Sequence, residues 1–134
     1  MDRFAQLTLG ITAAVFALVA CLGWFAPDIL MAPAGIEMTE AAGYAEIRAA
    51  YGGLFSASAL VYALGTARAS MRPHAIRLMA VVLGGFVLGR LISLVVEGVP
   101  STPALATLAV ESIGFIAALA VILTRADEPR TSPA

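Results

Sequence analysis

Lysine is absent from this 134-residue chain, and charge of either sign is scarce. Only 13% of the residues are charged, and the net charge at pH 7 is −1. A nucleic-acid partner requires a concentrated basic surface, so we expect none. The single cysteine, Cys21, excludes an intrachain disulfide. With only one histidine, His74, the chain also lacks the ligands of an ordinary zinc site, and we expect neither a metal nor a cofactor.

Apolar residues make up most of the chain instead. They account for 60% of it, and the mean hydropathy of +0.93 indicates that the surrounding solvent is lipid. Each of the main apolar segments has about 20 residues, the length at which a helix crosses a hydrocarbon core of about 30 Å. The sequence therefore predicts an all-α fold, a four-helix transmembrane bundle with spans at 4–26, 45–67, 76–96 and 104–124. We expect residues 1–124 to form a single domain and 125–134 a disordered cytoplasmic tail.

The arginines at the ends of the spans all fall on one side of the predicted bundle. They precede the first span, crowd the link between the second and third, and follow the fourth: Arg3, Arg68, Arg72, Arg77, Arg125 and Arg130. The other two links, 27–44 and 97–103, contain acidic residues but no arginine. Because cytoplasmic loops are enriched in basic residues, both termini are predicted to be cytoplasmic. The long link 27–44 either lies on the lipid surface or folds over the bundle as a lid.

Two opposite charges lie inside the apolar spans, at matching depths. Arg90 is seven residues before Glu97, at the outer end of the third span, and Glu111 is seven residues after Ala104, at the outer start of the fourth. At about 1.5 Å per residue, both lie roughly 10 Å below the outer interface. An unpaired charge at the centre of a bilayer costs about 2.5–3.5 kcal/mol. We therefore predict that Arg90 and Glu111 form an ion pair between these helices.

Helical spacing extends this pair to a predicted polar cluster on three spans. Arg90 shares a helix face with Ser93 and Glu97. Glu46 and Arg48 lie near the outer end of the second span and point to different sides of it. Both can reach water at the interface; alternatively, one of them turns inward and joins the pair. The predicted ligand-binding or polar cluster consists of Glu46, Arg48, Tyr51, Arg90, Ser93, Glu97 and Glu111.

Glycines occur where helices are expected to approach each other. The predicted packing positions are Gly52, Gly53, Gly85, Gly89 and Gly114. The third span contains a Gly-x-x-x-Gly motif, which in a bundle favours close packing within the chain. Packing between two copies of the chain is the alternative, so a homodimer or a membrane-protein partner stays open.

Three short stretches resemble the bacterial domain-of-unknown-function family 4345: AEIRAAYGG at 45–53, GRLISLVVEGVP at 89–100 and ES at 111–112. Members of that family are similar four-span proteins. They carry Glu-x-Arg before Tyr-Gly-Gly, then Gly-Arg, an acidic residue before Gly-x-Pro, and a glutamate in the last span. The acidic residue, often aspartate in the family, is Glu97 here. The resemblance covers residues 5–124 and implies the fold and the polar cluster, but no activity. In topology alone the chain is also similar to the DoxX-like membrane proteins.

These features favour a non-enzymatic protein of the bacterial cytoplasmic (inner) membrane. Since no nucleophile has a base beside it, we name no catalytic residue, and we expect an accessory or assembly protein, or one that binds a lipid-like molecule. A transporter of an anionic or amphiphilic substrate is one alternative. A membrane enzyme using Glu46 or Glu111 as acid or base is another, although a nearby arginine opposes protonation of either carboxylate. Beyond the bilayer itself, the expected partners are a lipid-like or anionic small molecule and a second membrane protein.

Overall fold

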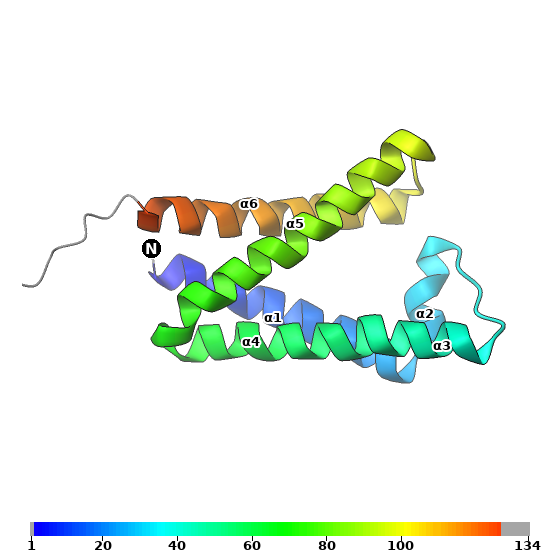
Figure 1. Cartoon of the computed structure of the whole chain (residues 1–134), viewed down its shortest axis with the longest axis horizontal. Coiled ribbons are helices and arrows are strands. Elements are labelled where there is room, and N and C mark those ends of the chain that lie inside the picture. Colours follow the sequence, from blue (N-terminus) through cyan, green and yellow to red (C-terminus); the bar gives the residue numbers. More distant parts are fainter. Residues whose placement is uncertain (1, 127–134) are drawn as a thin grey trace, which may run out of the picture.

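Helices provide all the regular structure in residues 2–126, the part of the chain that the computed structural model describes. Figure 1 shows their arrangement. In chain order they are α1 (Asp2–Phe25), α2 (Pro27–Met31), η1 (Ala32–Ala34), α3 (Ala41–Ile47), η2 (Arg48–Leu54), α4 (Phe55–Ala67), η3 (Ala69–Met71), α5 (Arg72–Val96) and α6 (Thr102–Ala126). The short elements η1 and η3 are 3₁₀ turns, and η2 is a π-helix that joins α3 and α4 into one continuous rod.

Four helical stretches are long and apolar enough to cross a membrane: Asp2–Phe25, Ala41–Ala67, Ala69–Val96 and Thr102–Thr124. They coincide with the four predicted spans, so the all-α, four-helix fold is confirmed. The second and third begin earlier than predicted, because α3 and η3 extend them into the links. These helices indicate a multi-pass membrane protein. The side of the membrane on which the termini lie stays a prediction.

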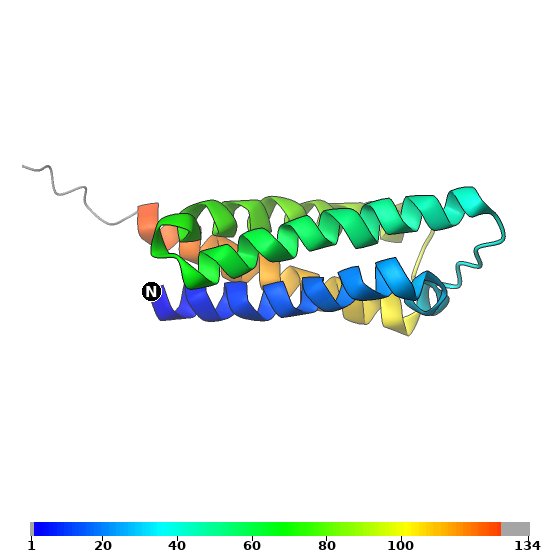
Figure 2. The ribbon, with the colours of Figure 1, turned by 90° about the horizontal axis from the view of Figure 1, so that it is seen from below.

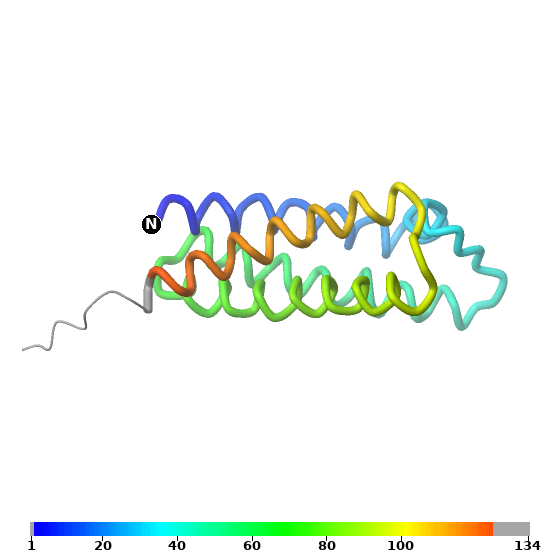
Figure 3. Tube along the Cα trace, turned by 90° about the horizontal axis from the view of Figure 1, so that it is seen from above, coloured from blue at the N-terminus to red at the C-terminus, as the bar shows by residue number. Residues whose placement is uncertain are grey.

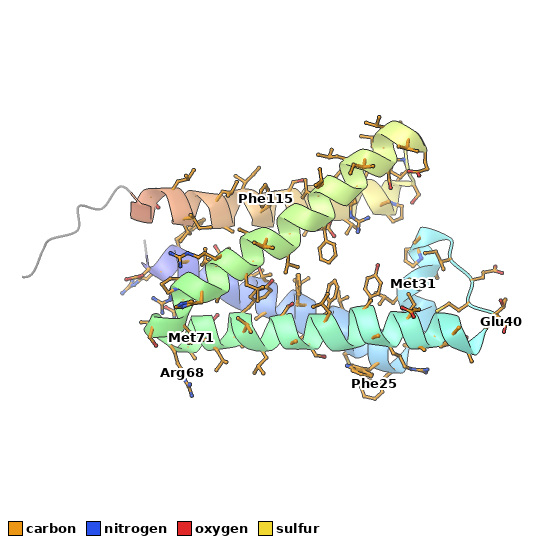
Figure 4. The ribbon with its side chains drawn as sticks, viewed as in Figure 1. Phe25, Met31, Glu40, Arg68, Met71 and Phe115 are labelled. Carbon is orange, nitrogen blue, oxygen red and sulfur yellow. The ribbon has the colours of Figure 1, made fainter. Side chains whose placement is uncertain are left out.

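The long helices pack as two antiparallel hairpins (Figures 1 and 2). One consists of α1 and the α3–η2–α4 rod, and the other of α5 and α6. Arg68 and Met71, in the link between the hairpins, mark one end of the bundle, called here the terminal end, where the N-terminus also lies (Figure 4). Glu40 lies at the opposite end, called the connector end, where the links within each hairpin are found (Figures 3 and 4).

The core lies in the half of the bundle next to the terminal end. Its largest fully buried side chains come from all four long helices: Leu9, Tyr62, Ile76, Met79 and Val121. Gly65 allows the hairpins to approach closely, because a Cβ atom there would overlap that of Ala75. Side chains from both hairpins thus fill this half of the bundle, and the two hairpins pack against each other there.

Arg72, the first residue of α5, connects α5 to α4 and α1 at the terminal end. Its side chain is 9% exposed, its Nε donates a hydrogen bond to the carbonyl oxygen of Gly65 at 3.3 Å, and Nη1 lies 3.4 Å from Asp2 Oδ1. Gln6 Nε2 donates to the carbonyl oxygen of Thr66 at 3.1 Å. Two carbonyl groups in the last turn of α4, which have no helical partner of their own, are thereby satisfied.

The second hairpin diverges from the first toward the connector end. All the buried residues of α5 lie between Arg72 and Leu83, and none is buried from Gly84 to Val96. Beyond this point α5 runs beside α6 and away from the α3–η2–α4 rod (Figure 1). Side chains in the second half of α5 are therefore only partly covered by protein.

The link 27–40 occupies the connector end. Pro27 begins α2, Gly35 adopts a left-handed conformation (φ 70°) after η1, and the Tyr44 hydroxyl donates to Asp28 Oδ1 at 2.9 Å. The η1 turn contacts α6, so the link reaches from the first hairpin to the second. That it acts as a lid stays a prediction.

The last helix extends two residues into the predicted C-terminal tail, since α6 ends at Ala126. The remainder of that tail, 127–134, lies outside the described residues.

Candidate functional site

Arg90 of α5 and Glu111 of α6 form a bidentate ion pair. Arg90 Nε donates to Glu111 Oε2 at 2.6 Å, and Nη2 donates to Oε1 at 3.1 Å. The side chain of Glu111 is 13% exposed and that of Arg90 is 37% exposed. The carboxylate is therefore the enclosed partner, and it holds one edge of the guanidinium in a fixed orientation.

The other edge of the guanidinium has no partner among the described residues. A guanidinium has five N–H groups, and Glu111 accepts two of them. Both hydrogens of Nη1 and the second hydrogen of Nη2 are left without an acceptor. They lie in the half of the bundle where α5 is incompletely covered.

A stack of aromatic rings joins the two hairpins on the face of α5 that carries Arg90. Phe55 of α4 stacks on Tyr51 of η2, with ring centroids 5.3 Å apart and planes at 22°, and on Phe86 of α5, at 5.6 Å and 26°. Phe16 of α1 also stacks on Phe55, at 4.6 Å. Tyr51 is connected through Phe55 to Phe86, which lies one helical turn before Arg90. We call Tyr51, Phe55, Phe86, Arg90 and Glu111 the interhairpin site.

The π-helix η2 is stabilised by α1 and positions Tyr51. A Cβ atom on Gly23 would lie 2.6 Å from Gly52 N, and one on Gly52 would lie 2.8 Å from the Trp24 ring, so only glycines allow this contact. Trp24 Nε1 donates to Ser56 Oγ at 3.2 Å, and Ser56 Oγ donates to the carbonyl oxygen of Gly52 at 2.6 Å. The wide turn is thus clamped in place, and π-turns of this kind are frequent at functional sites.

None of the other predicted cluster residues is hydrogen-bonded to the ion pair. Arg48 is exposed, donates from Nε to the Trp24 carbonyl oxygen at 3.4 Å, and lies over the Tyr44 ring at 5.6 Å. Glu46, Ser93 and Glu97 are exposed, and no described side chain binds them. The hypothesis that Glu46 or Arg48 turns inward is therefore wrong, because Arg48 bonds to the end of α1 and Glu46 is exposed. Of the seven predicted residues, the structure pairs Arg90 with Glu111 and places Tyr51 in the ring stack that reaches α5.

The predicted glycine positions divide into two groups. Gly52 packs against Trp24, and a Cβ on Gly114 would lie 2.7 Å from Leu83 Cδ1. Gly53 meets only the backbone of its own helix. Gly85 and Gly89 are exposed, with nothing within 4 Å of a Cβ there, so packing of this motif within the chain is wrong: it lies in the uncovered half of α5.

Sequence reasoning missed other close contacts, at Gly23, Gly65 and Phe86, whereas Gly84 belongs to the glycines expected at helix-packing positions. Gly84 faces Phe115 of α6, which is labelled in Figure 4: a Cβ atom on Gly84 would lie 2.9 Å from Phe115 Cε2. Gly84 and Gly65 lie on the faces that carry Ala80 and Tyr62, so helical spacing along the buried positions could have indicated them.

A family model described as Domain of unknown function (DUF4345) matches residues 4–122. The chain belongs to this family. No match exists among the curated proteins or among the solved structures. In this DUF4345 protein, Arg48, Tyr51, Gly52 and Gly53, through which the sequence resembles the family, all lie on the π-helix.

The chemistry of the interhairpin site is that of hydrogen-bond donation. Both oxygens of Glu111 accept from Arg90, so this carboxylate holds the guanidinium in place. In residues 2–126 no group of three His, Cys, Asp or Glu side chains is placed to hold a metal ion. What the site offers is a fixed set of N–H donors beside aromatic rings.

Proposed function

We propose that this DUF4345 protein binds a lipid-like amphiphile at the interhairpin site. The observation that carries the proposal is the free edge of Arg90. Three N–H donors, held in place by Glu111, have no acceptor among the described residues. An amphiphile with an oxygen acceptor in its head and an apolar tail supplies what is missing.

The surroundings of Arg90 make an external acceptor necessary. Within a bilayer, water does not satisfy polar groups, and each unsatisfied donor costs free energy. Arg90 lies six residues before the end of α5 at Val96, about 9 Å along the helix. Because the carboxylate of Glu111 fixes the guanidinium, the side chain is not free to extend toward the interface. A polar head must reach it instead.

The rings of the site suit the apolar part of such a ligand. Tyr51, Phe55 and Phe86 are all half-buried, so part of each ring is covered by no described residue. Their stacking fixes a wall that needs little reordering when a tail packs on it. Preorganised donors beside a rigid apolar wall are typical of small-molecule sites.

Binding is favoured over catalysis and transport. A catalytic acid or base needs a carboxylate that exchanges protons, and Glu111 is held by two hydrogen bonds. Glu46 is exposed and has no hydrogen bond or ion pair to Arg90 or Glu111. A protein partner is compatible with binding, and the exposed Gly85 and Gly89 face of α5 is the place where a second membrane helix would fit.

We further propose that the connector end faces the outside of the bacterial inner membrane. The charges support this orientation. Three exposed arginines, Arg3, Arg68 and Arg77, lie at the terminal end beside one exposed carboxylate, Asp2. Toward the connector end the exposed arginine Arg48 is outnumbered by exposed carboxylates: Asp28, Glu37, Glu40 and Glu97. In that orientation the interhairpin site lies in the outer leaflet.

Native mass spectrometry of the full chain in a mild detergent tests the binding proposal. We expect the wild type to retain a discrete additional mass that Arg90→Gln loses. Arg77→Gln is the matched control, because it removes an exposed arginine from the other end of the same helix. The proposal is wrong if the wild type carries no additional mass, or if both variants retain it equally.

A further inference from the structure

We infer that the amphiphile bound at the interhairpin site has an uncharged head with an oxygen acceptor, such as the carbonyl group of an ester. This inference rests on the proposed function and names the class of ligand. Its basis is the charge and the hydrogen-bond geometry of the ion pair.

The charge of the site is already balanced. The positive charge of Arg90 lies 2.6 Å from the negative charge of Glu111, so the pair presents no net charge to a ligand. The other cation on the η2 side, Arg48, is bound to the Trp24 carbonyl oxygen and to the Tyr44 ring. The nearest further charge on α5 is Glu97, an exposed carboxylate. Among the described residues, no second cation is hydrogen-bonded or ion-paired within the interhairpin site, so an anionic head would meet a pair without net charge.

An anionic head would carry an uncompensated charge into apolar surroundings. It would also be repelled by the carboxylate of Glu111, which it could displace only by leaving that carboxylate unpaired. A neutral oxygen accepts from two of the three free donors without either cost. The site therefore selects against lipids whose phosphate is the group that reaches it.

The geometry of the free edge matches a single oxygen. Glu111 occupies the edge formed by Nε and Nη2, which is the one that binds a planar anion side-on. The remaining edge, between Nη1 and Nη2, directs one hydrogen from each nitrogen toward a common point. A carbonyl oxygen has two lone pairs and can accept both.

Two lipids with identical tails test the inference. Dioleoylglycerol has ester carbonyls and no charge, whereas dioleoylphosphatidate adds an ionised phosphate to the same molecule. Each is titrated in native mass spectrometry onto the full chain after co-purified lipid has been exchanged for detergent. We expect the wild type to bind dioleoylglycerol about tenfold or more tightly than dioleoylphosphatidate, because an unpaired intramembrane charge is costly.

Glu111→Gln tests whether the ion pair sets this preference. Glutamine retains the size of the side chain but leaves the charge of Arg90 uncompensated, so we expect the preference to invert in favour of dioleoylphosphatidate. Glu97→Gln is the matched control, because it removes an exposed carboxylate from the same half of the bundle. It should leave the wild-type preference unchanged.

The outcomes separate the two proposals. If the wild type binds neither lipid and shows no additional mass, binding at the site itself is wrong. If it binds, but prefers dioleoylphosphatidate, only the uncharged head is wrong. Equal shifts in Glu111→Gln and Glu97→Gln would also overturn the inference, because they would show a general effect of net charge. The comparison of the two lipids on the wild type decides the question even if Glu111→Gln does not fold.

Discussion

Arg90 and Glu111 each depend on the other for a partner in apolar surroundings. Removing one leaves the other as an unpaired charge, which is costlier than removing both. The cost at Arg90 is moderated by its exposed fraction of 37%. The residue-scale consequence is a coupling between the two side chains that mutagenesis can measure.

We predict that Arg90→Ala and Glu111→Ala each lower the free energy of unfolding by about 1–3 kcal/mol. The double variant should be at least as stable as the less stable of the two single variants. The apparent melting temperatures of the three proteins in one detergent check this. Glu97→Ala, at an exposed carboxylate, is the control and should melt like the wild type. Additive losses in the double variant would contradict direct pairing.

The pairing of Arg90 with Glu111 could be predicted from the sequence, because the depth of each residue follows from the number of residues between it and the end of its helix. Depth along a straight α-helix is fixed by the rise per residue, and opposite charges at one depth attract. The position of Arg48 relative to the residues of α4 could not be predicted, because the sequence interpretation assumed 3.6 residues per turn through a segment that forms a π-helix. A π-helix has wider turns than an α-helix, so the residues that follow Arg48 are rotated relative to it. Local sequence does not specify this turn; the contact of Gly52 with Trp24 does.

At the scale of elements, glycines decide where helices meet and where they do not. At Gly23 the neighbouring atoms are backbone atoms of Tyr51 and Gly52, which cannot move without shifting η2. At Gly85 there is open space. Identical substitutions at these two positions should therefore have opposite effects.

We predict that Gly23→Ala lowers the melting temperature markedly, because the added methyl group would lie 2.6 Å from Gly52 N. Gly85→Ala should leave it unchanged or raise it, since alanine in a helix interior is favoured over glycine by about 0.5–1 kcal/mol. Thermal unfolding of both variants in detergent gives the comparison. A loss at Gly85 as large as that at Gly23 would mean that a second copy or another protein packs on the Gly85 face.

For the whole molecule, composition predicted the architecture because the bilayer restricts it. Four apolar segments of spanning length admit only helices, and their order permits few arrangements. Composition could not predict that the hairpins part toward the connector end. That separation depends on which side chains fill the half near the terminal end, where Tyr62, Met79 and Val121 are fully buried. It is also what leaves one edge of Arg90 open.

The orientation in the membrane follows from charge and can be tested on the intact protein. In a Cys21→Ala background, Ser101→Cys places a thiol in the exposed link between α5 and α6, and Ser70→Cys places one in the exposed η3 turn. We predict that a membrane-impermeant maleimide applied to spheroplasts labels the Ser101→Cys variant alone, because the arginines at the terminal end retain it in the cytoplasm. Labelling of both variants after lysis is the control. Labelling of Ser70→Cys alone would show the opposite orientation. The interhairpin site would then lie in the inner leaflet, and its ligand would come from the lipids on the cytoplasmic side.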